Sequence, residues 1–203
     1  MNIDLNKLHP YPFEKLNALK SGISPPAVLT HIALSIGEPK HPPPEFVRET
    51  LANALDKLSA YPLTKGLPEL RGTIAEWLCQ RFSLQTVCPE TQVLPVNGTR
   101  EALFAFAQVI INRSHEPVVM SPNPFYQIYE GAALLAGARL HFLNCTEGNA
   151  FCPDWASVSP EIWQQCQLIY ICSPGNPSGA VLDIDTLQSL IQLADQYDFT
   201  IAS

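Results

Sequence analysis

A chain of 203 residues, of which 46% are hydrophobic and 15% charged, is long enough for one large domain and apolar enough for a sizeable core, which excludes general disorder. Its formal net charge of −7, from 12 Lys and Arg against 19 Asp and Glu, leaves no basic patch, so we expect no nucleic-acid partner. No apolar run reaches the length of a membrane span and the N-terminus has no apolar signal-peptide core, so we expect a cytoplasmic protein without a membrane partner.

The first 90 residues are expected to form two regions. Residues 1–43 predict an irregular, proline-rich N-terminal arm, and residues 44–90 predict a helical segment of the arm or of a small domain. Apolar residues recur at helical spacing from Glu45 to Leu58 and again from Pro68 to Phe82. The stretch "AYPLTKGLPELR" between them reads as a loop.

Residues 91–203 alternate short apolar runs with helical patterns, which indicates an α/β fold with a mostly parallel sheet flanked by helices. The predicted strands are "QVLPV", "PVVMS", "RLHFL", "QLIYICS" and "FTIAS", and the predicted helices are "TREALFAFAQVII", "FYQIYEGAALLAG" and "DTLQSLIQLADQY". Right-handed crossovers would gather the strand-end loops on one edge, where such sheets bind ligands. The chain stops inside the last predicted strand, so we expect a truncated domain.

Six cysteines are spread along the chain without a C-x-x-C pair, and no spacing of His and Cys suits zinc. We therefore expect reduced thiols, several of them buried, and no metal site.

Three predicted strand-end loops carry polar or aromatic side chains that suit a ligand. In "NGTRE", Gly98 and Thr99 open a helix whose free N–H groups attract anions, although this loop by itself favours an ordinary helix cap by Thr99. In "SPNPFY", Phe125 or Tyr126 could present a ring over the strand ends, or both could be core residues. In "SPGNPSG", prolines and glycines hold the carboxamide of Asn176 in place, unless the loop is a turn chosen for shape alone. Together the three loops suit a flat, phosphorylated ring.

These loops, in this order, resemble the fold-type I (class I/II) aminotransferases, which use pyridoxal 5′-phosphate. The resemblance implies the fold of the N-terminal half of such an enzyme, and it implies roles for particular residues. "SPGNPSG" implies that Asn176 hydrogen-bonds the phenolic oxygen of the cofactor. "NGTREAL" implies that Gly98, Thr99 and Arg100 bind its phosphate, and "PNPFYQIYEGA" implies that Tyr126 stacks on its pyridine ring.

Two further motifs imply contacts beyond these loops. "YPLTKGLPELR" implies that Tyr61 reaches the cofactor phosphate of a neighbouring subunit, and hence a homodimer. "LSIGEP" implies that Gly37 contacts the carboxylate of the substrate. The expected partners are therefore small amino acids, 2-oxo acids and a second copy of the chain.

The residues of three motifs most resemble the succinyldiaminopimelate aminotransferases of bacterial lysine biosynthesis. The motifs are "LHPYPFEKL", "LSIGEPKHP" and "SPNPFYQIYEGAALLAGA". This similarity implies amino transfer between glutamate and a 2-oxo acid, with N-succinyl-2-amino-6-oxopimelate as the expected acceptor. Two alternatives stay open. One is another fold-type I enzyme with the same cofactor, such as an aromatic or aspartate aminotransferase or a C–S lyase, and the other is a non-catalytic, truncated homologue.

The family's catalytic lysine, which carries the cofactor as a Schiff base, has no counterpart in this sequence. The six lysines stand at positions 7, 15, 20, 40, 57 and 65, and none follows. We therefore assign no catalytic residue, and we expect no turnover from the 203-residue chain by itself.

Overall fold

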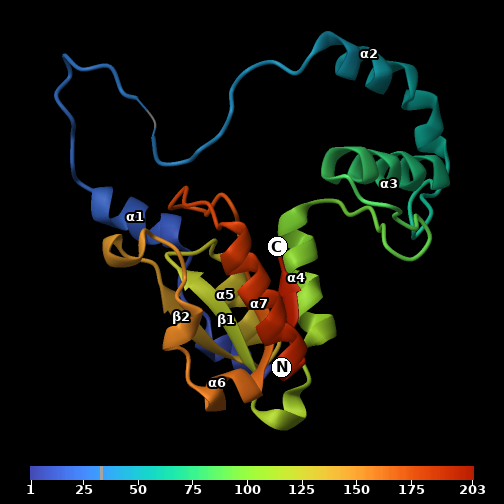
Figure 1. The fold of residues 1–203 in the computed structure, drawn as a ribbon. Helices are drawn as coiled ribbons and strands as arrows, with labels where there is room; N and C mark the ends of the chain where they lie inside the picture. The colour runs from blue at the N-terminus through green and yellow to red at the C-terminus, as the bar shows by residue number, and fades with distance from the viewer. Residues whose placement is uncertain (33) are drawn as a thin grey trace. The chain divides into compact units, whose positions relative to one another are not determined.

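The computed structural model describes residues 1–32 and 34–203, and the chain forms two compact units (Figure 1). Unit 1 comprises Met1–Lys20 together with Val96–Ser203, and unit 2 comprises Ser21–Pro95. These units differ from the expected divisions at residues 43 and 90, because the first 20 residues join the α/β unit. The assignment of residues 1–43, 44–90 and 91–203 to an arm, a helical segment and a partial large domain stays a prediction.

Unit 1 is built around a sheet of four parallel strands in the order β2-β1-β3-β4. The strands are β1 (Val118–Asn123), β2 (Arg139–Asn144), β3 (Cys166–Tyr170) and β4 (Thr200–Ala202). The expected parallel α/β sheet is therefore confirmed. The strand expected at "QVLPV" is wrong, because residues 92–96 form no strand. Pro95 has no N–H to donate to a strand ladder, which disfavours pairing there.

Helices cover both faces of the sheet, because successive strand residues point to opposite sides. On one face, Val119, Leu168 and Tyr170 pack with residues of two helices, and on the other Val118 and Ile169 pack with residues of two more. The first pair is α4 (Thr99–Ile110) and α5 (Ile128–Leu135), and the second is α6 (Pro160–Gln165) and α7 (Ile184–Tyr197). The short 3₁₀ helices of unit 1 are η1 (Ile3–Lys7), η3 (Arg113–His115), η4 (Glu147–Asn149) and η5 (Trp155–Ser157).

Strands β1 and β3 lie side by side, and the chain leaves them towards opposite faces. Helix α5 connects β1 to β2 across one face, whereas α7 connects β3 to β4 across the other. The loops that leave two such strands diverge, and this opens a crevice at the carboxyl end of the sheet. The fold therefore has a topological switch point between β1 and β3.

The N-terminal 20 residues belong to unit 1 and contain regular structure, where the sequence predicted an irregular segment. They form η1 and α1 (Pro12–Lys20). The side chain of Asp4 is 6% exposed, and its oxygens pair with Lys7 Nζ at 2.8 Å and with Arg113 Nη1 at 3.2 Å. A buried carboxylate needs such partners, so this pair of cations fixes η1 against η3.

Unit 2 contains α2 (Glu45–Asn53), η2 (Leu55–Ser59) and α3 (Pro68–Phe82). The helix expected over Pro68–Phe82 is confirmed with the same bounds. The helix expected from Glu45 to Leu58 ends earlier, at Asn53, and the 3₁₀ helix η2 follows it. Among residues 1–32 and 34–203, none of the helices combines the length and apolar character that a membrane crossing requires.

Replacing Asp4 by Asn tests the anchoring of the N-terminal segment. A hydrogen bond from Lys7, followed by the charges of Lys7 and Arg113, holds the pKa of Asp4 below its ordinary value. A carboxylate with a lowered folded-state pKa stabilises the protein above its unfolded-state pKa and loses that contribution as the pH falls. We therefore expect Asp4→Asn to lower the thermal midpoint at pH 7, and the difference from wild type to disappear as the pH falls below about 4. Circular dichroism melts at several pH values measure this, with the exposed Asp195→Asn as control.

Candidate functional site

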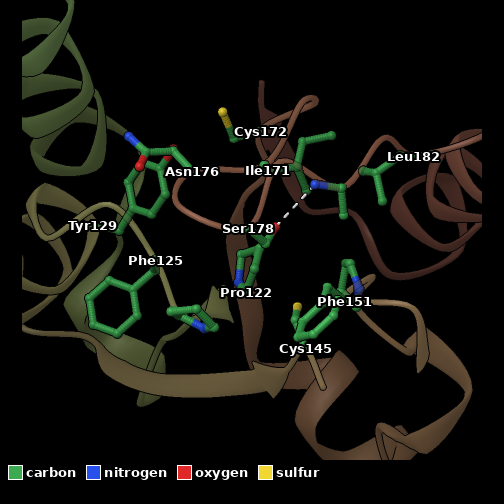
Figure 2. A pocket seen from close by; sticks show the side chains of 14 residues that line it. Pro122, Phe125, Tyr129, Cys145, Phe151, Ile171, Cys172, Asn176, Ser178 and Leu182 are labelled. Carbon is green, nitrogen blue, oxygen red and sulfur yellow. Dashed lines mark hydrogen bonds between the residues drawn. The ribbon is translucent and has the colours of Figure 1, made fainter. Parts of the chain in front are cut away.

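A small hollow lies at the switch point, lined by residues at the ends of β1, β2 and β3 and in the loops that follow them (Figure 2). Its volume is about 20 Å³, which is room for a single water molecule, so a ring-sized ligand would have to lie over its mouth. The lining residues are Pro122, Pro124, Phe125, Tyr129, Cys145, Phe151, Pro153, Ile171, Cys172, Gly175, Asn176, Ser178, Ala180 and Leu182. Figure 2 shows Asn176 and Tyr129 together at one end of the hollow, with Cys145 and Phe151 at the other.

The loop after β3 is closed by its own backbone. Gly175 N–H donates to the Ala180 carbonyl at 2.7 Å, and Gly179 N–H donates to the Gly175 carbonyl at 2.7 Å. A side chain at Gly175 would come within 2.5 Å of Ser178 Oγ, and Gly179 has a φ of +75°, so both positions favour glycine. The prolines and glycines of "SPGNPSG" thus build a compact loop that presents Asn176 at its tip.

The carboxamide of Asn176 is exposed, and no hydrogen bond found among the described residues uses it. An amide side chain offers two N–H donors and one acceptor. The loop therefore holds a donor at the carboxyl end of β3 that is free to meet a ligand atom. This placement agrees with the role expected of Asn176, and that role stays a prediction.

The two aromatic residues after β1 pack against the same apolar cluster but contact different rings. Phe125 stacks on Phe142 with ring centroids 5.2 Å apart, whereas Tyr126 meets Tyr129 edge to face at 5.8 Å. Tyr129 lines the hollow, and Tyr126 is half-buried beside it without lining it. Burial, followed by the nearby Cys172 and Tyr126, raises the pKa of Tyr129 to about 12, so its hydroxyl stays neutral near pH 7. The ring expected to stack on a ligand thus belongs to an aromatic pair at the edge of the hollow.

Helix α4 begins at Thr99 without a side-chain cap. The capping position is Gly98, with a φ of +156°, and a side chain there would collide with the carboxylate of Glu101. The alternative that Thr99 itself caps the helix is not what the structure shows. Uncapped N–H groups at a helix start attract anions, so this end of α4 suits a phosphate. Arg100 pairs with Glu101 at 3.3 Å, so its expected contact with a phosphate stays a prediction.

One apolar cluster joins the elements that carry the three predicted loops. It contains Tyr170 of β3, Tyr129 of α5 and Ala107 of α4, with Tyr126 and Leu103 packed against it. The three loops therefore belong to segments that pack together within unit 1, and Figure 1 shows the start of α4 and the loop after β3 at the same end of the sheet.

Gly37 and Tyr61 belong to unit 2, so their predicted roles stay predictions. The side chain of Tyr61 is 97% exposed. No lysine is among the residues that line the hollow in the described part of the chain. No cluster of three or more His, Cys, Asp or Glu side chains arranged for a metal ion occurs among the described residues.

The sequence reasoning missed four residues of this region: Tyr129, Cys145, Phe151 and Tyr170. Cys145 directly follows β2, so the rule that strand-end residues gather at one edge would have found it. In the sequence, Tyr129 and Tyr170 are no different from ordinary core residues of a helix and a strand. Only their contacts in the structure show that they belong to this region.

The sequence matches the model of the aminotransferase class I and II family over residues 30–202. The chain belongs to this family. Among curated relatives, the LL-diaminopimelate aminotransferase of Syntrophobacter fumaroxidans is 30% identical over 96% of this chain and 50% of its own length. The enzyme of the same name from Dehalococcoides mccartyi is 31% identical over 84% of this chain and 44% of its own. The chain thus spans about half the length of the curated relatives it matches.

Solved structures agree with this placement. An aminotransferase from Neisseria meningitidis Z2491 has a TM-score of 0.93 at 49% identity, and the match covers 100% of this chain and 52% of that one. Aminotransferase AspB from Helicobacter pylori 26695 has a TM-score of 0.87 at 34% identity, covering 96% of this chain and 50% of its own. The expected fold-type I architecture is therefore confirmed.

Members of this family use pyridoxal 5′-phosphate, and the residues of unit 1 fit that cofactor. The uncapped α4 start with a glycine whose Cβ would fill the space suits a phosphate. The exposed carboxamide of Asn176 and the ring of Tyr126 suit a flat heterocycle with a polar substituent. The expectation of this cofactor is confirmed, whereas the individual contacts stay predictions.

Replacing Gly98 by Ala tests the α4 start as a phosphate site. The new Cβ would meet Glu101, and the φ of +156° is one that residues with a side chain rarely adopt. We expect Gly98→Ala to raise the Kd for pyridoxine 5′-phosphate by about tenfold, since a change of about 1.4 kcal/mol is tenfold. Isothermal titration calorimetry measures this. Gly131→Ala is the control, because nothing lies within 4 Å of a Cβ at Gly131, and an equal effect of both variants would contradict the prediction.

Proposed function

We propose that the protein is a pyridoxal-phosphate-dependent aminotransferase that moves an amino group between glutamate and a 2-oxo acid. The observation that carries this proposal is the exposed Asn176, which lines the hollow at the switch point together with Tyr129, the ring on which Tyr126 packs. The uncapped start of α4 supports it. Membership of the aminotransferase class I and II family supports it.

The cofactor supplies an electron sink for the bonds at the substrate's α-carbon. The residues of this chain would hold it in place. The N–H groups at the start of α4 and the hydroxyl of Thr99 would bind its phosphate, and the ring of Tyr126 would pack on the flat face of its heterocycle. The carboxamide of Asn176 would donate a hydrogen bond to its phenolic oxygen, which orients the ring and stabilises negative charge on that oxygen.

None of the lysines of unit 1 lines the hollow. Lys7 pairs with Asp4 at 2.8 Å, and Lys15 and Lys20 lie in α1. The chain's own residues therefore bind and orient, whereas the group that moves the proton has to come from residues other than those that line the hollow. This supports the expectation of no turnover from the 203-residue chain by itself.

The substrate that we propose is N-succinyl-2-amino-6-oxopimelate. The motifs that resemble the succinyldiaminopimelate aminotransferases support this choice. The names of the relatives favour a second candidate, because several are LL-diaminopimelate aminotransferases. Both N-succinyl-2-amino-6-oxopimelate and LL-diaminopimelate carry the reacting carbon next to a carboxylate. The role proposed for Gly37 is to bind that carboxylate.

We propose a homodimer in which Tyr61 of each subunit contacts the cofactor phosphate of the other. The nearly complete exposure of Tyr61 supports this, because a tyrosine ring left in water gains by covering its apolar faces at an interface.

The experiment that tests the function uses the product of the full reading frame that contains this chain. It is incubated with pyridoxal 5′-phosphate, 2-oxoglutarate and either N-succinyl-LL-diaminopimelate or LL-diaminopimelate, and glutamate formation is measured. Glutamate formation from the succinylated substrate confirms the proposal in full, and formation from LL-diaminopimelate alone replaces its substrate. Release of ammonia without glutamate, or release of a thiol when a sulfur-containing amino acid is the substrate, indicates a different enzyme of the family. Bound cofactor with no reaction toward these substrates or toward aspartate and aromatic amino acids indicates a non-catalytic homologue.

Replacing Asn176 by Ala tests the proposed role of its carboxamide in that assay. Loss of a hydrogen bond to a charged oxygen costs about 1.5–3 kcal/mol, so we expect kcat/KM for amino transfer to fall by about 10-fold to 100-fold. Steady-state kinetics with the preferred substrate measure this. Asn17→Ala, in exposed α1, is the matched control, and an unchanged kcat/KM in Asn176→Ala would contradict the assigned role.

A further inference from the structure

We infer that Tyr170 is a positioning residue, whose hydroxyl sets the spacing between the start of α4 and the loop that carries Asn176. The inference rests on the proposed function, because these two segments are the ones assigned to the phosphate and to the ring of the cofactor. Tyr170 touches neither the hollow nor the ligand groups themselves.

Tyr170 contacts all three elements that carry the predicted loops. It is the last residue of β3, and the loop to Asn176 follows it directly. Its hydroxyl donates to the carbonyl of Leu103 in α4 at 2.7 Å, across 67 residues of sequence. Its ring stacks on Tyr129 of α5 with centroids 4.4 Å apart and an interplanar angle of 7°.

The hydroxyl of Tyr170 links β3 to α4, which the stacking of its ring on Tyr129 does not do. Tyr170 is 0% exposed, and a phenylalanine there would keep the stacking on Tyr129 without needing a polar partner. A buried tyrosine hydroxyl needs one, and Leu103 supplies it from a position five residues beyond Gly98, about one and a half helical turns into α4. Burial, with Tyr129 nearby, raises the pKa of Tyr170, so the hydroxyl remains a donor at every ordinary pH.

The spacing matters because a phosphorylated ring has a fixed length. Its phosphate and its ring oxygen must meet the α4 start and the Asn176 loop at the same time. Inorganic phosphate meets the α4 start alone and is indifferent to the spacing. A change at Tyr170 should therefore weaken the ligand that spans both segments and spare the one that touches a single segment.

Tyr170→Phe tests the inference in the purified protein, with isothermal titration of pyridoxine 5′-phosphate and, separately, of inorganic phosphate. This ring ligand lacks the aldehyde, so lysines elsewhere do not react with it. We expect the Kd for pyridoxine 5′-phosphate to rise by about fivefold to tenfold, the effect of one buried hydrogen bond, and the Kd for inorganic phosphate to stay within about twofold. Tyr197→Phe is the matched control, because Tyr197 stacks on Trp163 in the core on the opposite face of the sheet.

Three results would overturn the inference. Unchanged affinity of Tyr170→Phe for pyridoxine 5′-phosphate shows that the hydroxyl does not set the spacing, and leaves the proposed function intact. An equal loss for both ligands, or the same loss in Tyr197→Phe, shows a general loss of stability, which thermal melts of the same samples also record. Wild-type protein that binds neither ligand overturns the proposed function together with the inference.

Discussion

Strands β1 and β3 pair side by side while both of their faces are buried, and the position of each candidate site residue in unit 1 follows from that pairing. Helices on opposite faces force the two outgoing loops apart, which opens the edge of the sheet between them. The loop after β1 then supplies an aromatic segment and the loop after β3 supplies Asn176. The register that buries alternate residues of both strands therefore also brings the loop of Phe125 and the loop of Asn176 to the same hollow.

Two kinds of charged or polar group lie at the start of α4: the backbone N–H groups, which are fixed, and the exposed side chains of Arg100 and Glu101. The backbone N–H groups at the start of α4 are fixed, and they favour an anion whatever the side chains do. The carboxylate of Glu101 lies next to Gly98 and is paired with the exposed Arg100. An exposed ion pair of this kind contributes little stability, so it would oppose the proposed binding of a phosphate at the helix start only weakly.

Local patterns predicted much of this structure from the sequence, and they failed where distant contacts decide. The apolar spacing of Pro68–Phe82 and the turn residues around Asn176 are local signals, and both predictions were correct. The structure of residues 1–20 depends on distant partners such as Arg113, which pairs with Asp4 across 109 residues of sequence. The composition of that segment alone therefore suggested an irregular arm. The strand expected at "QVLPV" failed for a similar reason, because a strand needs a neighbour and the pattern of a single segment does not provide one.

Tyr170 illustrates the same limit inside the site. In the sequence it is one more apolar residue of "QLIYICS", and its burial agrees with that reading. The structure adds a hydrogen bond to α4 and a parallel stack on α5, so a residue that looked like packing joins three segments. Since a buried hydroxyl is costly unless it is paired, a tyrosine at a position that a phenylalanine would fill points to a requirement of geometry rather than of packing alone. The loops of the site are exposed, but their spacing is set one layer below, in the core between the sheet and its helices.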